Sequence, residues 1–249
     1  MISAVFSSAD IMAVEKTETE RIFLRGVGVF PFSDADRLID YAQVHKGILV
    51  AVNAEKIANA SPQTKEIINS NIAYCDGAGA VMAARKKGAS PTKIAGCELW
   101  LKIIGRFHAD KTFYIVGATP EVHQATIEKL AEQFPGIRIV GHRDGYLRSE
   151  DERKALVDDV VAKRPDIVFV AMGSPAQEIL MSEMLARHRA VYQGLGGSFD
   201  VYTGKVKRAP QWWLDHNLEA AYRLLRQPKR LKRDIVYLKF IWWLMLNKF

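Results

Sequence analysis

The sequence predicts an α/β fold in which a mostly parallel, Rossmann-like sheet carries helices on both faces. Two observations support this fold class. Short continuous apolar runs such as Gly47–Val52 (GILVAV) are typical of strands that are buried on both sides. These runs alternate with segments of ten or more residues that have helical character, and parallel strands need crossovers of that length. The same alternation recurs along most of the chain, so one sheet accounts for the pattern.

The expected elements follow from these runs and from the residues that cap helices. Asp34 and Ser61 precede two of the predicted helices and are good N-cap residues. We predict strands at 22–32 (one or two short ones), 47–52, 72–75, 112–116, 137–140, 167–172 and 191–195. We predict helices at about 34–45, from 62, at 79–85, from 96, at 120–134, at 150–162 and from 176. Residues 1–218 would form the catalytic domain, and residues 219–249 a basic, aromatic helical appendage for membrane association.

Polar residues or glycines stand where five of these strands end. They are Asn53, Asp76, Gly117, Gly173 and Gly196. In open α/β sheets ligands bind along the carboxyl edge, so we expect the five positions to line one cleft. Asp76, followed by Gly-Ala-Gly, is suited to act as a general base. Capping of the next helix explains Asp76 as well. Asn53 could hold a hydroxyl of the ligand, and capping is again the alternative.

The stretch from Ala171 to Pro210 has the composition of an anion site. Gly173-Ser174-Pro175 leads into a helix that carries Gln177 and Glu178, and unpaired N–H groups at such a helix start favour anions. After Gly196 come one carboxylate and several cations, namely Asp200, Lys205, Lys207 and Arg208. This combination indicates a phosphorylated or nucleotide-linked ligand. Ordinary βα turns in a stable domain remain the alternative.

The C-terminal region is basic and amphipathic. The chain has a net charge of +7, and much of the excess lies in Arg223, Arg226, Lys229, Arg230, Lys232 and Arg233. An apolar stripe follows at helical spacing, formed by Leu231, Ile235, Leu238, Trp242, Met245 and Phe249, and Tyr237, Phe240 and Trp243 widen it. Such a helix indicates an anionic membrane surface. Packing of the helix on its own domain is the alternative; nucleic acid is a third, but no nucleic-acid module is visible.

Several other functions are not supported. Gly77-Ala78-Gly79 matches half of a dinucleotide fingerprint, but Met82 stands where its third glycine belongs. The six histidines lack metal spacing, and Asp34-Ala35-Asp36 looks like a helix cap, so we expect neither a metal nor a cofactor. Two cysteines do not make a disulfide scaffold. No signal peptide or spanning segment of about 20 apolar residues is apparent, and we expect a cytoplasmic location.

Six ordered blocks carry a resemblance to a known family. They are VAVNAEKI, YCDGAGAVMAAR, IAGCELW, YIVGATPEV, PDIVFVAMGSPAQEI and LGGSFDVYTGKVKRAPQWW. From about residue 22 onward the chain resembles the WecG/TagA/CpsF glycosyltransferases, glycosyltransferase family 26. Within the family, VNAEK, AMGSPAQE and GKVKRAP are most similar to the enzymes that transfer N-acetyl-D-mannosaminuronate from UDP in enterobacterial common antigen synthesis. The teichoic-acid enzymes, which transfer N-acetylmannosamine, are the near neighbours.

The resemblance implies an inverting, metal-independent transfer from a UDP-sugar to N-acetylglucosaminyl-diphospho-undecaprenol. The enzyme would work as a peripheral protein on the inner face of the cytoplasmic membrane. The family's base corresponds to Asp76, and its pocket residues to Asn53, Gln177 and Asp200. Lys93 stands where the teichoic-acid enzymes have arginine, and Ala51 where they have threonine. We expect further substrate contacts from Gly117, Gly173, Gly196, Arg208, Arg223, Arg226 and Arg230.

Overall fold

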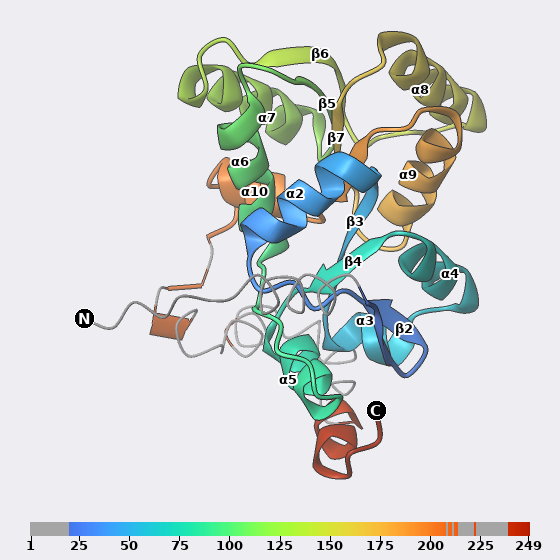
Figure 1. Cartoon of the computed structure of the whole chain (residues 1–249). Coiled ribbons are helices and arrows are strands. Elements are labelled where there is room, and N and C mark those ends of the chain that lie inside the picture. The colour runs from blue at the N-terminus through green and yellow to red at the C-terminus, as the bar shows by residue number, and fades with distance from the viewer. Residues whose placement is uncertain (1–19, 208, 211, 214–221, 223–238) are drawn as a thin grey trace.

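A six-stranded sheet, parallel throughout, forms the centre of the molecule. Figure 1 shows the computed structural model, which describes residues 20–207, 209–210, 212–213, 222 and 239–249. The strands are β3 (Gly47–Val52), β4 (Ile72–Cys75), β5 (Thr112–Gly117), β6 (Arg138–Arg143), β7 (Ile167–Ala171) and β8 (Val191–Gly194). Their order across the sheet is β4-β3-β8-β7-β5-β6. The predicted α/β fold is therefore confirmed.

Asp34 and Ser61 begin helices as predicted, and two further caps, Thr119 and Ser149, appear in the structure. The side chains of Asp34, Ser61, Thr119 and Ser149 each accept a hydrogen bond from an N–H group in the first turn of the helix that follows. The longer helices are α2 (Ala35–His45), α4 (Pro62–Ser70), α5 (Ala78–Lys86), α6 (Gly96–Phe107), α7 (Pro120–Gln133), α8 (Glu150–Lys163) and α9 (Ala176–Arg187). Two short helices were not predicted, α3 (Ala54–Asn59) and α10 (Ser198–Tyr202).

Each face of the sheet has its own hydrophobic core, because neighbouring strand residues point to opposite faces. In β7, Val168 and Val170 join one core, whereas Phe169 joins the other. The first core is covered by α4, α8 and α9, and the second by α2, α6, α7 and α10. Figure 1 shows α8 and α9 along one side of the sheet and α6 and α7 along the other. Strands buried on both sides explain why their sequences are continuous apolar runs.

A hairpin precedes the sheet, within the stretch where one or two short strands were predicted. It consists of β1 (Ile22–Leu24) and β2 (Val27–Val29), which pair antiparallel. Arg25 and Gly26 form its turn with φ angles of 54° and 82°, a region that glycine adopts without strain. The backbone N–H of Gly28 donates to Asn69 Oδ1 at 2.7 Å, so the hairpin is held against α4.

The last described segment contains a helix at residues 239–245, which packs beside α5 (Figure 1). Phe240 is 2% exposed, and its ring lies 3.1 Å from the position that a Cβ on Gly79 would take. Trp243 is buried with it, whereas Trp242 and Met245 are exposed. Phe240 and Trp243, which we expected to widen the apolar stripe, thus pack on the domain. Leu231, Ile235, Tyr237 and Leu238 lie outside the described residues. None of the described helices is long and apolar enough to cross a membrane.

Candidate active site

A cleft of about 1960 Å³ opens at the carboxyl ends of β3, β4 and β8. The first turns of α5 and α6 and the residues before α9 border it, and the C-terminal helix contributes Phe240, Ile241, Leu244 and Met245. Six of the predicted site residues lie along its wall, namely Asn53, Asp76, Lys93, Gln177, Gly196 and Asp200. Residues from distant parts of the chain are therefore brought together at the sheet edge where ligands of α/β proteins bind.

Asp76 is held by neighbours on both sides. Its N–H donates to the carbonyl of Val52 at 2.8 Å, which continues the pairing of β4 with β3. Its Oδ1 accepts a hydrogen bond from the N–H of Gly96 at 3.3 Å, at the start of α6. The N-cap of α5 is Gly77, without a side-chain hydrogen bond, so the capping interpretation of Asp76 is wrong for that helix. The carboxylate instead lies at the N-terminal end of α6.

Asn53 has the capping role that was one of its two interpretations. Its Oδ1 accepts from the N–H of Lys56 at 3.0 Å and so begins α3. Its amide NH₂ group donates to no other described residue, while the side chain lines the cleft. Capping orients the amide, and the NH₂ group is available to a ligand hydroxyl. The two interpretations are therefore compatible.

Gln177 joins two loops beside the cleft. Its Oε1 accepts from the N–H groups of Gly173 at 3.2 Å and of Gly196 at 2.9 Å. The side chain is 5% exposed, and a Cβ on Gly194 would lie 2.4 Å from Nε2. Gln177 thus shapes the wall through the loops that follow β7 and β8.

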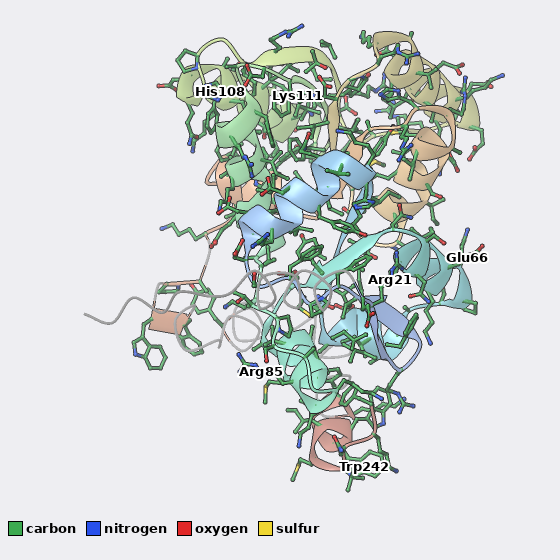
Figure 2. All side chains as sticks on the ribbon, in the orientation of Figure 1. Arg21, Glu66, Arg85, His108, Lys111 and Trp242 are labelled. Atoms are coloured by element: carbon green, nitrogen blue, oxygen red, sulfur yellow. The ribbon has the colours of Figure 1, made fainter. Side chains whose placement is uncertain are left out.

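Among the described residues that line the cleft, cations outnumber carboxylates. Its basic residues are Lys56, Arg85, Lys86, Lys93, Lys205 and Lys207, and its acidic residues are Glu55, Asp76, Glu98 and Asp200. Arg85 and its place on α5 can be followed in Figure 2. Sequence reasoning assigned no role to Lys56, Arg85 or Lys86. The pattern VNAEK contained a signal, since Lys56 lies one helical turn after Asn53. The resulting positive field favours an anionic ligand.

A buried ion pair forms the base of the cleft next to Gln177. Lys56 Nζ lies 2.7 Å from Glu178 Oε1, and the two side chains are 15% and 2% exposed. Gln177 Nε2 donates to the same oxygen at 3.3 Å. Glu178, an acidic residue in the first turn of α9, therefore ties α9 to α3.

Polar side chains lie beneath Asp76 as well. Gln193 Nε2 donates to the carbonyl of Gly96 at 3.0 Å, and the Tyr74 hydroxyl lies 3.0 Å from where a Cβ on Gly96 would be. Both side chains are fully buried. Burial raises the pKa of Tyr74 well above its usual range, and the nearby charge of Asp76 adds to this. Gln193 thus holds the residue whose N–H group binds the carboxylate of Asp76, and Tyr74 packs against that residue.

Two predicted contacts lie away from the cleft wall. Gly117 ends β5 with φ +124°, and a Cβ there would lie 2.3 Å from the carbonyl oxygen of Ala171. Gly117 is thus needed for the close approach of β5 and β7, and the expectation that all five strand ends line one cleft is corrected. Gly173 does not line the cleft either, but its N–H group donates to Gln177, which does. Gly117 lies away from the cleft because the strand order places β5 two strands away from β8.

Other predicted residues either lie elsewhere or are not described. Arg208, Arg223, Arg226 and Arg230 fall outside the described residues. Asp34 caps α2, as its sequence setting indicated, and Asp36 pairs with Lys102 at 2.7 Å. Within the described parts of the chain, no three His, Cys, Asp or Glu side chains come together as metal ligands would.

The comparison with known families agrees with this architecture. Residues 28–249 match the Glycosyl transferase WecG/TagA/CpsF family. The chain belongs to this family. It is accordingly a hexosyltransferase that acts in the synthesis of cell-envelope polysaccharide. Membership implies a sugar-nucleotide donor and a lipid-linked acceptor, which agrees with the positive charge of the cleft.

Proposed function

We propose that the enzyme transfers N-acetyl-D-mannosaminuronate from UDP to N-acetylglucosaminyl-diphospho-undecaprenol, with inversion and without a metal. The observation that carries this proposal is the position of Asp76. The carboxylate of Asp76 lines the cleft, and its Oδ1 accepts a hydrogen bond from the N–H of Gly96, the first residue of the twelve-residue helix α6. A carboxylate that lines the cleft can remove a proton from a hydroxyl that binds there.

The reaction then needs only groups of the chain. Asp76 accepts the proton of the acceptor hydroxyl as its oxygen attacks the anomeric carbon of the donor. The bond from that carbon to the diphosphate breaks, and the electron pair leaves on UDP. Lysine and arginine side chains stabilise the charge that develops on the diphosphate. Lys93, Lys205 and Lys207 line the cleft, and all three are exposed to it.

The donor sugar has a second candidate, N-acetylmannosamine. The motifs VNAEK, AMGSPAQE and GKVKRAP support the uronate, because they resemble the enzymes that use it. A non-catalytic nucleotide- or lipid-binding protein, the third alternative, does not agree with membership in a family of enzymes.

Transfer of radiolabelled sugar from each UDP-sugar to the lipid-linked acceptor tests the proposal. We expect product from the N-acetylmannosaminuronate donor, little from N-acetylmannosamine, and undiminished product in excess EDTA. Product from N-acetylmannosamine alone would assign the other donor. Activity that EDTA abolishes and Mg²⁺ restores would contradict the metal-independent mechanism. The Asp76→Asn protein, purified in parallel, serves as the inactive control.

A further inference from the structure

A second hollow, of about 560 Å³, lies on the other side of the C-terminal helix from the cleft. We call it the basic pocket and define it by Arg25, Lys65, Lys239, Lys248 and Trp243. Arg25 comes from the turn of the β1–β2 hairpin, Lys65 from α4, and the other three from the C-terminal segment. None of the described side chains that line the pocket is acidic. Four cations from three separate parts of the chain therefore converge on one hollow.

The cations are arranged by aromatic rings and by the backbone. The guanidinium of Arg25 lies 3.9 Å from the ring centre of Trp243 and donates to the carbonyl of Lys248 at 3.0 Å. Lys239 lies 5.0 Å from the same ring, and Lys65 Nζ donates to the carbonyl of Arg25 at 3.3 Å. Cation–π contacts hold a positive charge without neutralising it.

No carboxylate of the described residues forms an ion pair with these four side chains. By contrast, many other basic side chains of the molecule do pair with acids, as Lys56, Arg153 and Arg187 do. Like charges repel, so their convergence without a partner favours the binding of an anion.

Exposed apolar side chains stand next to the basic pocket on the same helix. Trp242 and Met245 are 52% and 78% exposed, and Ile241 and Leu246 are about half exposed. Lys248 lies 4.6 Å from the ring centre of Trp242. Figure 2 shows Trp242 on the surface of the C-terminal helix, at the end of the molecule opposite His108 and Lys111. Tryptophan beside lysine is the composition that the interface of a lipid bilayer favours.

We infer that the basic pocket binds the phosphate group of an anionic phospholipid while Trp242 and Met245 enter the bilayer interface. The ligand is thus an anionic membrane surface, and half of its binding site belongs to the hairpin and α4 instead of the C-terminal helix. Arg25 suits this role because a guanidinium donates two parallel hydrogen bonds to a phosphate. Lys65, Lys239 and Lys248 supply further charge at the same place.

Docking in this way orients the cleft. Ile241, Leu244 and Met245 line the cleft, whereas Lys239 and Trp243 of the same helix line the basic pocket. A bilayer that contacts the helix from its exposed side therefore lies at the mouth of the cleft. This step rests on the proposed function, because only a lipid-linked acceptor requires that placement.

Sedimentation of the full-length chain with vesicles tests the inference. We expect binding to vesicles of phosphatidylglycerol and phosphatidylcholine at low salt, and none to phosphatidylcholine alone. Arg25→Gln/Lys65→Gln should weaken binding about 10-fold or more, since each cation near an anionic surface contributes about 1 kcal/mol. The matched control is Arg138→Gln/Lys154→Gln, which removes the same charge from β6 and α8, where both side chains are exposed. The control should bind like the parent.

Several results would overturn the inference. One is equal sedimentation of the Arg25/Lys65 variant and the parent; another is an equal loss in the control, which would indicate unspecific attraction by net charge. A third is sedimentation that shows no preference for vesicles with phosphatidylglycerol but is inhibited by millimolar inorganic phosphate. This result would assign the basic pocket to free phosphate. Arg25 also donates a hydrogen bond to the carbonyl of Lys248, so its replacement could disturb the C-terminal segment. The variant Lys65→Gln/Lys239→Gln keeps this hydrogen bond and serves as a second test.

Transfer assays keep the two proposals separate. With a water-soluble acceptor that lacks the long lipid, the Arg25/Lys65 variant should turn over like the parent. If the parent transfers no sugar at all, the proposed function fails while the vesicle result stands.

Discussion

At the scale of single residues, the carboxylate of Asp76 depends on a peptide group twenty positions later in the chain. Gly96 donates its N–H to Asp76, and Gln193 holds the carbonyl of the same residue from β8. A Cβ on Gly96 would lie 3.0 Å from the hydroxyl of Tyr74, so any larger residue there requires this buried tyrosine to shift. The carboxylate of Asp76 is thus positioned through Gly96, which the buried side chain of Gln193 holds in turn.

Replacement of Asp76 by asparagine tests its role directly. The amide keeps the shape of the side chain and can still accept the hydrogen bond from Gly96, but it cannot take a proton. We expect turnover to fall roughly 100-fold or more, the usual scale for a general base, with UDP affinity and thermal stability unchanged. Titration with UDP and single-turnover transfer measure the two effects. Near-normal turnover would exclude Asp76 as the base.

The two cysteines should differ sharply in reactivity. Cys75 is 1% exposed, and burial, with a smaller effect of Asp76, raises its thiol pKa to about 12. Cys97 is half-buried and lines the cleft. Because the thiolate is the reactive form, iodoacetamide at pH 8 should modify Cys97 and leave Cys75 unmodified in the native protein.

Mass spectrometry of the native and denatured protein checks this prediction. UDP should slow the modification of Cys97 if the nucleotide occupies the cleft, and the Cys97→Ser protein should show no native labelling. Rapid labelling of Cys75 would contradict the buried environment of β4.

At the scale of elements, the ion pair of Lys56 and Glu178 joins α3 to α9. Removal of the lysine leaves the carboxylate of Glu178 buried without its cation, so Lys56→Met should lower the free energy of unfolding by about 3 kcal/mol. The double variant Lys56→Met/Glu178→Leu should regain most of this loss. Urea unfolding measures all three proteins.

An exposed pair provides the matched control. Lys102 and Asp36 are also 2.7 Å apart, but their side chains are 46% and 58% exposed. Lys102→Met should therefore change stability by less than about 1 kcal/mol. Equal losses from Lys56→Met and Lys102→Met would show that burial contributes nothing to the first pair.

Most elements were predictable, since their signals are local. Asp34 and Ser61 mark helix starts, and strands such as β3 and β7 are continuous apolar runs. The composition of the cleft was less predictable, because it depends on strand order, and β8 inserts between β3 and β7 through pairings that no local pattern encodes. Asn53 and Asp76 were therefore placed correctly at the cleft, whereas Gly117 was not. The partnership of Lys56 with Glu178 spans 122 residues and has no signal in either motif alone.

At the scale of the whole molecule, the C-terminal helix belongs to only one of the two cores. Phe240, Trp243 and Leu244 join the core on the side of α8 and α9, whereas the core beneath α2, α6 and α7 contains no residue from this helix. The six-stranded sheet therefore has most of its packing without the C-terminal region. The exposed side of the helix, with Trp242 and Met245, remains for another partner.

Deletion of residues 231–249 distinguishes a membrane appendage from a purely structural helix. We expect the shortened chain to unfold in a single cooperative transition at a lower temperature, because it loses the buried side chains of Phe240, Trp243 and Leu244 but keeps the six-stranded sheet. It should no longer sediment with anionic vesicles, and transfer to the lipid-linked acceptor should stop. The variant Trp242→Ala/Met245→Ala serves as the matched control, since both side chains are exposed. It should weaken vesicle binding while the melting temperature stays within about 2 °C of the parent. A shortened chain that fails to fold, together with an intact chain that ignores vesicles, would establish the helix as structural.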